Sequence, residues 1–250
     1  KLLVELALVR VLNRRGICTE AAVKEVEAAC NQITTAEVYK EEDRIRHDIR
    51  ALVNCIRAKI SDTAKPFVHM TATSYDIINP ANAARFRDVV QEVLIPSLVG
   101  LGKTLITTAL REAETVQIGR THGQHAVPIT FGFALAGYVS RLGGSIEKLK
   151  LLAAELPGKF SGAVGAYNAS SLFFDDPEEF EIEVLAELGL SPAEHSTQIV
   201  PPEMLTRLLC EVTIAAGILA NLSDDMRNLQ RTEIGEVGEE FEAAQVGSST

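Results

Sequence analysis

The stretch from Pro202 to about Glu240 contains little that would stop a helix, and this feature constrains the fold more than any other. At 1.5 Å per residue, a helix of some 30 residues within it would be about 45 Å long. Within it, residues 213–222 are apolar on every side, and such a helix needs neighbours all round. The chain is therefore expected to form a bundle of long helices.

Further segments show helical spacing of apolar residues or the residue types that start a helix. In addition to residues 202–240, the sequence predicts helices at residues 2–13, 19–32, 36–59, 80–114 and 128–155. Asn79 and Pro80 are the expected N-cap and first position of one helix, and Pro96 is its expected kink. Asp176-Pro177 and Ser191-Pro192 resemble the starts of two shorter helices. No strand-like alternation longer than a few residues is apparent, so the predicted fold class is all-α.

The predicted architecture has two parts: a small N-terminal helical domain, residues 1–70, and an elongated long-helix bundle, residues 71–250. Three long apolar helices cannot all bury their faces within one chain, so we expect other copies of the chain to complete the bundle. In the first helix, Glu5 is expected on the polar face. Lys1 already lies within that helical pattern and residues 247–250 stop in a glycine-serine loop, so we expect a fragment whose start is missing.

Composition narrows the classes of partner. The chain has 24 basic and 34 acidic side chains, a formal net charge of −10, whereas nucleic-acid binding needs clustered Lys and Arg. We therefore expect no nucleic acid, although a small anionic substrate needs only a local pocket of donors. The four cysteines form no C-x-x-C pair, so a reduced, cytoplasmic setting is expected. The apolar run at residues 213–222 is about half the length that spans a bilayer, so no membrane is expected.

The densest group of hydrogen-bond donors lies in the polar loop of residues 119–124, between two predicted helices. It combines an arginine, the Thr121 hydroxyl, the His122 imidazole and an amide, with glycines that let backbone approach a ligand closely. Histidine titrates near neutral pH and can give or take a proton during catalysis. The alternative is a polar turn in which His122 caps a carbonyl. A metal pair of His122 and His125 is not expected, because their spacing suits no single helix face and no third ligand is apparent.

Three further polar segments interrupt the apolar background. His69 precedes Thr73 and Ser74, whose hydroxyls could hold a carboxylate or phosphate, or could form only an N-cap and turn. Gln198 is a weaker candidate. Ser248 lies in a glycine-serine loop after a charged helix end; it could be a reactive serine or part of a flexible loop. No Gly-x-Ser-x-Gly elbow is present, so serine-hydrolase chemistry is not expected.

In chain order, these segments resemble the fumarase and aspartase superfamily over nearly the whole chain. The matching segments are His69–Asp76, Gly119–Gln124, Ser161–Gly165, Ser196–Gln198 and Glu233–Ser249. Within the superfamily, the Arg120-to-Gln124 segment and the triplet Arg46-His47-Asp48 most resemble the adenylosuccinate lyase family. Argininosuccinate lyases and carboxymuconate cycloisomerases are alternatives in the same superfamily. A non-catalytic structural protein on this scaffold is an alternative from another class.

The resemblance implies an all-helical homotetramer whose active sites combine three subunits, acting without a cofactor on a small nucleotide substrate. The implied reaction is a trans β-elimination that releases fumarate from adenylosuccinate and from the corresponding succinylated ribotide in purine biosynthesis. His122 would protonate the leaving nitrogen, and Ser248 would remove the carbon-bound proton. The resemblance assigns substrate binding or orientation to a further set: His47, His69, Thr73, Ser74, Thr121 and Gln198.

The sequence also departs from the family pattern. The Met-Pro and Lys-x-Asn elements that follow the paired serines in the family are not part of this sequence, which ends at Thr250, and neither is the family's C-terminal domain. The family's N-terminal Arg-Tyr segment is absent as well. Residues 199–203 run Ile-Val-Pro-Pro-Glu, where many relatives carry basic residues.

Overall fold

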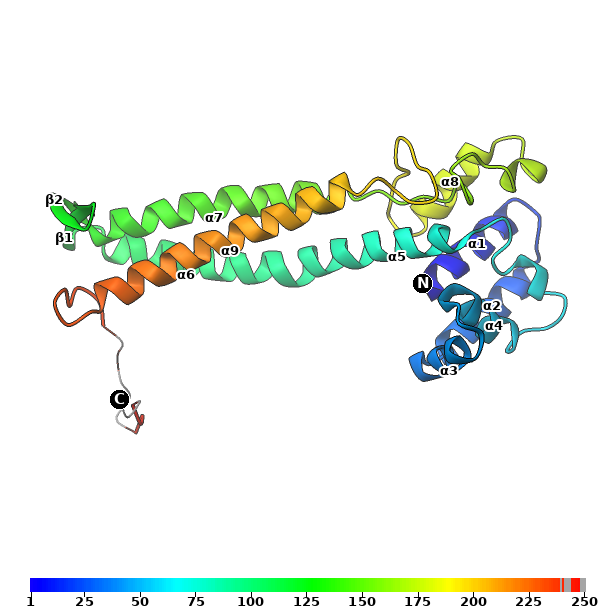
Figure 1. The fold of residues 1–250 in the computed structure, drawn as a ribbon, viewed down its shortest axis with the longest axis horizontal. Helices are drawn as coiled ribbons and strands as arrows, with labels where there is room; N and C mark the ends of the chain where they lie inside the picture. Colours follow the sequence, from blue (N-terminus) through cyan, green and yellow to red (C-terminus); the bar gives the residue numbers. More distant parts are fainter. Residues whose placement is uncertain (239, 241–243, 248–250) are drawn as a thin grey trace. The chain divides into compact units, whose positions relative to one another are not determined.

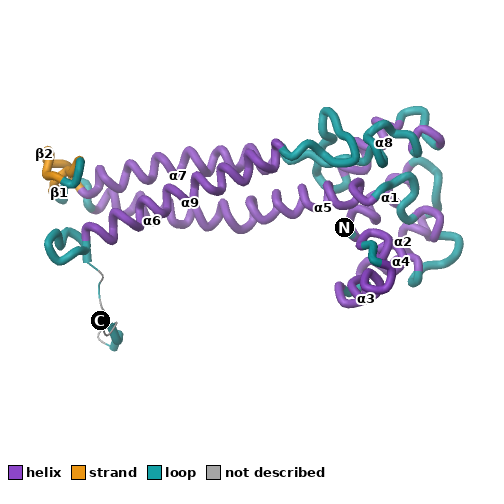
Figure 2. The backbone as a smooth tube through the Cα atoms, viewed as in Figure 1, coloured by secondary structure: helices purple, strands orange, loops and turns teal. Residues whose placement is uncertain are grey.

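The computed structural model describes residues 1–238, 240 and 244–247. Figures 1 and 2 show the described part of the chain as mainly helices joined by loops, with strands in one hairpin. The helices are α1 (Leu2–Arg14), α2 (Glu20–Gln32), α3 (Thr35–Ile45), α4 (Asp48–Arg57), α5 (Ser74–Val89), α6 (Ile95–Arg111), α7 (Phe131–Ala154), α8 (Pro177–Ala186) and α9 (Glu203–Leu229). Short helical turns occur at Lys65–Phe67, Val90–Leu94 and Ser170–Leu172, and the strands are β1 (Val116–Thr121) and β2 (Gln124–Thr130). The predicted all-α class is confirmed.

The chain divides into two compact units. Unit 1 contains residues 1–93 and 151–208, and unit 2 contains residues 94–150 and 209–250. Helices α7 and α9 therefore each contribute residues to both units.

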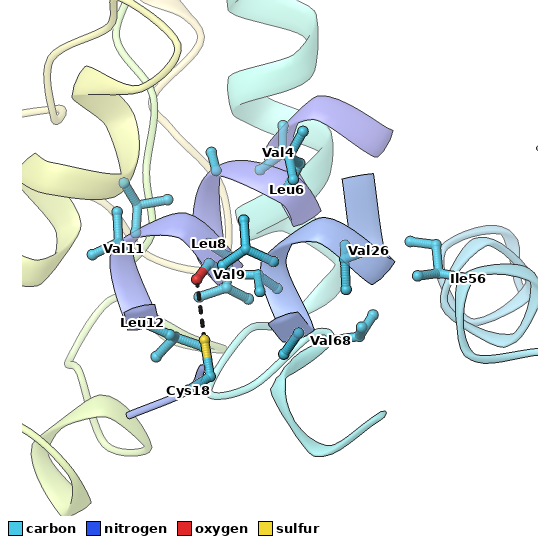
Figure 3. Packing of buried hydrophobic residues seen from close by; sticks show 14 of the residues in the cluster. Val4, Leu6, Leu8, Val9, Val11, Leu12, Cys18, Val26, Ile56 and Val68 are labelled. Atoms are coloured by element: carbon cyan, nitrogen blue, oxygen red, sulfur yellow. Dashed lines mark hydrogen bonds between the residues drawn. The ribbon is translucent and has the colours of Figure 1, made fainter. Parts of the chain in front are cut away.

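The hydrophobic core of unit 1 surrounds α1, as Figure 3 shows. Leu8, Val9 and Leu12 of α1 are fully buried, and Val26 of α2 and Ile56 of α4 belong to the same cluster. The Cys18 thiol donates a hydrogen bond of 3.4 Å to the Val9 carbonyl, and this bond is drawn in Figure 3. Helix α1 is buried on nearly every side because α2, α5 and α8 all pack against it.

The prediction that Glu5 lies on a polar face of the first helix is wrong, because Glu5 is buried. Its two carboxylate oxygens accept hydrogen bonds from the backbone N–H and the ring Nδ1 of His69. A buried carboxylate is tolerated where such donors satisfy it. Only the tertiary contact with His69 determines that this polar residue faces inward.

The helix predicted over residues 36–59 is two helices, α3 and α4. Arg46 at the end of α3 has a left-handed backbone with φ of 58°. His47 then forms the N-cap of α4, and its Nδ1 accepts a hydrogen bond of 3.1 Å from the Arg50 N–H. The first N–H groups of a helix have no backbone acceptor within that helix. The His47 side chain supplies an acceptor at the start of α4, which favours two separate helices over one continuous helix.

The helix predicted to begin at Pro80 begins six residues earlier, at Ser74. Asp76 at its third position accepts a hydrogen bond of 2.9 Å from the Thr73 N–H, in the manner of a capping box. Where a kink at Pro96 was expected, the structure has a π-helical turn at Val90–Leu94, immediately before α6. Proline cannot donate to the carbonyl four residues earlier, and a π turn accommodates the missing bond.

Unit 2 contains antiparallel helical segments. At the N-terminal end of α7, a Cβ on Gly132 would lie 2.3 Å from the Ala109 carbonyl of α6, so the two backbones nearly touch. Between α7 and α9, Tyr138 bonds to Asp225 and Ser145 bonds to Glu211. From the first of these bonds to the second, the residue numbers rise along α7 and fall along α9, so the two helices are antiparallel.

The connection between α6 and α7 is a β-hairpin, which the sequence analysis did not predict. Pro128, the expected first residue of the next helix, lies within β2, and α7 starts at Phe131. The helix predicted to reach Glu240 ends at Leu229, where the Glu236 N–H returns to the Leu229 carbonyl at 2.9 Å. Ser191-Pro192 starts no helix.

Two helical stretches, Ser74–Arg111 and Glu203–Leu229, have the length and apolar composition of membrane spans. The sequence analysis expected no membrane from residues 213–222 alone, and that stretch is shorter than either of these helices. Core helices of soluble proteins can meet the same criterion, and here only 17% of each window is buried by the rest of the chain. These apolar faces therefore need a cover that the described residues do not provide.

Candidate active site

His122 occupies the tip of the hairpin in unit 2. Thr121 pairs with Gln124, so His122 and Gly123 form a two-residue turn, with φ values of 55° and 69°. Positive φ at both positions defines a type I′ turn, which matches the twist of the flanking strands. His122 is exposed, and no hydrogen bond or ion pair of its ring is found among the described residues. The turn holds the backbone and leaves the imidazole accessible.

A β-bulge interrupts the pairing of β1 and β2 close to this turn. Ile118 pairs with Pro128 and Arg120 pairs with His125, so the register shifts between these two pairs. A Cβ on Gly119 would lie 2.7 Å from the Val127 carbonyl oxygen, so only glycine allows the strands to approach this closely. Ala126 and Val127 of β2 thus lie opposite Gly119 of β1, and such bulges often serve to re-aim a nearby side chain.

Arg120 fixes the segment that follows α9 against the hairpin. Its guanidinium binds both oxygens of the Glu236 carboxylate, and Gln117 Nε2 donates to the same carboxylate at 2.9 Å. The hydrogen bond from Arg120 is the main cause of a lowered pKa at Glu236. The segments Gly119–Gln124 and Glu233–Ser249, far apart in sequence, are thus joined within unit 2.

An open cavity of about 610 Å³ lies beside this contact in unit 2. Its lining combines apolar side chains of α6, α7 and α9 with polar groups near the hairpin. The polar members are Thr108, Arg111, Glu112, Thr115, Gln117 and Glu236. The cavity could hold a polar ligand or be filled by another part of the protein.

His69 lies in unit 1, in the loop before α5. Its ring Nδ1 is 2.7 Å from Glu5 Oε1, and its backbone N–H donates to Glu5 Oε2 at 2.9 Å. The two bonds to one buried carboxylate fix both the ring and its backbone, which has φ of 65°. The other ring nitrogen, Nε2, remains for a ligand. A carboxylate hydrogen-bonded to Nδ1 is a common way to orient an imidazole.

Thr73 and Ser74 form the N-cap and the first residue of α5. The backbone N–H groups at a helix N-terminus and the helix dipole favour an anion there. Both residues are half-buried. The N-cap that the sequence offered as the alternative is present, and the binding of a carboxylate or phosphate here stays a prediction.

The segments containing Ser161 and Gln198 meet in unit 1. Ser161 and Ser196 share a hydrogen bond of 2.8 Å between their hydroxyls, both of them buried. A Cβ on Gly165 would lie 2.2 Å from the Ser196 carbonyl oxygen, so the two backbones are in direct contact. Gln198 follows on this loop with its side chain exposed.

The remaining predicted residues have different settings. His47 caps α4, and because its Nδ1 accepts a hydrogen bond, Nε2 carries the proton of the neutral ring. Ser248 lies outside the described residues. No group of His, Cys, Asp and Glu side chains suited to a metal ion is found in the part of the chain that the structure describes.

The five segments thus form two groups. Unit 1 brings together His69–Asp76, Ser161–Gly165 and Ser196–Gln198, through contacts of Asp76, Lys159 and Ser161. Unit 2 brings together Gly119–Gln124 and the described part of Glu233–Ser249. The sequence analysis missed Glu5, Lys159 and Glu236 as partners of these segments. Lys159 carried a signal, since it is a lone charge between a Pro-Gly pair and an apolar, glycine-rich stretch.

Comparison with known proteins gives consistent matches. A family model described as a lyase matches residues 3–250. The adenylosuccinate lyase of Archaeoglobus fulgidus is 39% identical over 248 residues, covering 99% of this chain and 54% of that protein. The adenylosuccinate lyase of Thermotoga maritima is 34% identical over 248 residues, covering 98% of this chain and 55% of that protein. The chain spans about half the length of the curated relatives it matches.

Two solved structures share the fold. A fumarate lyase from Mesorhizobium sp. BNC1 gives a TM-score of 0.84 at 26% identity, covering 94% of this chain and 55% of that one. A 3-carboxy-cis,cis-muconate lactonizing enzyme from Pseudomonas putida gives a TM-score of 0.80 at 28% identity, covering 94% of this chain and 53% of that one.

Proposed function

From the premise that the chain belongs to the lyase family whose model spans residues 3–250, we propose that the full protein is a C–N lyase of the adenylosuccinate lyase type. It releases fumarate from adenylosuccinate to give AMP, and acts likewise on the succinylated aminoimidazole carboxamide ribotide. The exposed imidazole of His122, on a turn held by a bulge, is the observation that carries the reaction. The names of the relatives support the choice of substrate.

In this proposal the elimination uses one acid and one base. His122 protonates the departing nitrogen, and Ser248 removes the proton from the carbon beside the carboxylate. Acid and base on opposite sides of the substrate suit a trans elimination, because the proton and the nitrogen leave from opposite faces. A serine is a weak base unless neighbours stabilise its anion, so this role requires such neighbours in the assembled site.

The intermediate carries a doubled negative charge on one carboxylate, so fixed donors lower the barrier most if they bind that charge as it develops. Thr73, Ser74, Thr121 and Gln198 supply hydroxyl and amide donors for the substrate's anionic and amide-like groups. His69 and His47 position the phosphate and orient His122. The Nε2–H of His47 and the bond of His69 to Glu5 support these roles, because each leaves Nε2 available.

We further propose a homotetramer whose active sites combine several subunits, with no cofactor, no nucleic acid and no membrane. The segments of unit 1 and unit 2 are then completed by those of other copies. The long helices support this assembly, since they carry exposed apolar side chains such as Leu110, Phe133 and Ile214. Assembly would cover the faces that otherwise resemble membrane spans. The setting of such an enzyme is the cytoplasm.

The test uses the full-length protein and follows the absorbance change of adenylosuccinate. The informative variant is His122→Asn, because asparagine favours the type I′ turn and removes only the imidazole. We expect kcat to fall by about 10²–10⁴, the usual contribution of a general acid, with an unchanged melting temperature. His125→Asn, on the same hairpin, is the control and should keep near wild-type activity. Near-normal turnover in His122→Asn would contradict the acid assignment.

A second candidate follows from the likeness to the P. putida lactonizing enzyme. That reaction also acts on a carboxylate-rich substrate, but relatives of that kind tend to lack a histidine matching His122. Assaying the full-length protein with 3-carboxy-cis,cis-muconate and with argininosuccinate separates these activities. Turnover of either in preference to adenylosuccinate would replace the proposed substrate, and no turnover of any would favour a structural role.

A further inference from the structure

Asp76 and Lys159 form an ion pair in unit 1 that the proposed chemistry does not use. Both side chains have no solvent exposure, and Lys159 Nζ lies 2.5 Å from Asp76 Oδ1. Removing two charges from water costs several kcal/mol per ion, and apolar residues of similar volume often give an equal or greater stability. The fold alone therefore gives little reason for a buried ion pair here, so its other contacts need to be considered.

The pair holds the backbone of two separate segments. Asp76 Oδ2 accepts a bond of 2.9 Å from the Thr73 N–H, and Asp76 Oδ1 accepts one of 3.3 Å from the Gly162 N–H. Lys159 Nζ donates to the Gly162 carbonyl at 2.8 Å. Both polar backbone groups of Gly162 and the N-cap of α5 are thus fixed by one pair of charges. Apolar side chains could fill the same volume but could not make these directional bonds.

The contacts continue from Gly162 to the loop of Gln198. Ser161, next to Gly162, bonds to Ser196, and Gly165 packs on the Ser196 carbonyl. Gly162 itself has φ of 83°, a conformation that is open to glycine and unfavourable for a residue with a Cβ. The position of Thr73 and Ser74 relative to Gln198 thus depends on a chain of contacts that starts at Asp76 and Lys159.

We propose that the Asp76–Lys159 pair is a positioning device that sets the spacing between the Thr73–Ser74 hydroxyls and the Ser196–Gln198 loop. This inference rests on the proposed function, in which those residues bind the substrate's anionic and amide-like groups. The pair touches no substrate atom in this scheme. It acts through the backbone of Thr73 and Gly162, and so affects substrate affinity more than proton transfer at His122.

The experiment measures KM and kcat for adenylosuccinate in the full-length protein. Three variants are compared: Asp76→Glu, Lys159→Arg, and the double variant Asp76→Asn/Lys159→Met. The first two keep the charges but change the reach of the side chains, and the double variant leaves no unpaired buried charge. We expect KM to rise at least about tenfold, as for the loss of one or two hydrogen bonds to a charged ligand, with kcat within about threefold of wild type.

Arg15→Met is the control for a lost ion pair in the same unit, because Arg15 binds Asp176 and Glu183 and contacts none of these segments. Its KM should equal that of wild type. A second readout is the rise in melting temperature on adding AMP, which should shrink in the three variants and not in Arg15→Met.

The outcomes separate the two proposals. If wild type does not cleave adenylosuccinate, the proposed function fails. If wild type is active and the folded variants keep its KM and its response to AMP, the positioning role alone is overturned. The same conclusion follows if none of the three variants folds, because the pair would then be needed for the fold itself.

Discussion

Backbone strain among the described residues gathers at the candidate site. Five described residues other than glycine have positive φ, and four of them lie in or beside the segments proposed to bind or convert substrate: Arg46, His69, Thr71 and His122. A left-handed backbone costs roughly 1–2 kcal/mol for a residue with a Cβ, so the surrounding contacts must hold it. For His69 that contact is Glu5, and for His122 it is the hairpin.

Thr71 is the least explained of these residues. It is β-branched with φ of 63°, and its Oγ1 is the buried side-chain oxygen that lacks a hydrogen-bond partner among the described residues. Both Thr71→Gly and Thr71→Ala remove the unpaired hydroxyl and the γ-methyl, but only Thr71→Gly also removes the Cβ and with it the strain. We expect Thr71→Gly to have a free energy of unfolding about 1 kcal/mol above that of Thr71→Ala, measured by urea denaturation. An equal or lower value would mean that the backbone here is not strained.

Glu181 gives a pH-dependent prediction. Burial raises its pKa above the model-compound value of 4.5, although bonds from Tyr167 and the Phe160 N–H act in the opposite direction. The folded state then holds the proton more tightly than the unfolded state, so this group's contribution to stability is full below pH 4.5 and is lost as pH rises through the raised pKa. Glutamine does not titrate, so Glu181→Gln removes this loss of stability with rising pH.

We therefore expect the unfolding free energy of Glu181→Gln, relative to that of wild type, to increase as pH rises from 4.5. Urea denaturation of both proteins at a series of pH values measures this difference. Glu179→Gln, at an exposed position of α8, controls for removing a charge from the same helix. A difference between Glu181→Gln and wild type that stays constant or moves the other way would contradict the assignment.

Among the elements, the hairpin of β1 and β2 differs most from what helical patterning predicts. Its strands are short and it contains Pro128, so neither composition nor period identified it. A two-stranded ribbon is marginal by itself. Here Arg120 and Gln117 bind Glu236, and the Gly132 N–H bonds to the Glu112 carbonyl at 3.0 Å, so the ends of helices stabilise the ribbon.

Gly119→Ala tests the bulge that precedes His122. The added Cβ would meet the Val127 carbonyl at 2.7 Å, so the strands must separate. We expect a loss of roughly 1–3 kcal/mol in unfolding free energy, as for other overpacked sites, together with a lower kcat because His122 moves. Gly137→Ala in α7 is the matched control, since its Cβ meets nothing within 4 Å, and it should be neutral or stabilising. Equal effects of the two substitutions would argue against a special role for the bulge.

At the scale of the whole molecule, the long helices bury few of their apolar residues within the chain. Leu98, Leu142 and Ile218 are buried, whereas Leu110, Phe133 and Ile214 on the same helices are exposed. The described residues leave much of these helices uncovered, and the two groups of candidate segments lie in different units. A symmetric assembly would cover the apolar faces and complete the sites at the same time.

Mixed oligomers test that assembly. His122→Asn and His69→Gln should each be nearly inactive alone, because each removes an imidazole from one of the two groups of segments. If a site takes these residues from different copies, random mixing of equal amounts leaves about a quarter of the sites intact, so coexpression should restore activity to about that fraction. Light scattering of the mixture gives the oligomeric state. Mixed oligomers that remain inactive would show that one chain supplies both residues.

The sequence by itself determined what is local or ordered along the chain. Helical character followed from apolar spacing in α1, α2, α7 and α9, which the structure confirms. The order of the five polar segments was also readable, because each consists of neighbouring residues. The predicted roles of His122, Ser248 and the binding residues stay predictions.

Only the tertiary structure decided how distant residues are paired. Glu5 faces inward because His69 satisfies it, and Lys159 is buried because Asp76 and the Gly162 carbonyl receive its charge. The hairpin exists because Gly119 allows the strands to touch and Arg120 binds Glu236. A periodic pattern records which side of an element is apolar, but a polar residue's position depends on a partner from elsewhere in the chain, which no local pattern contains.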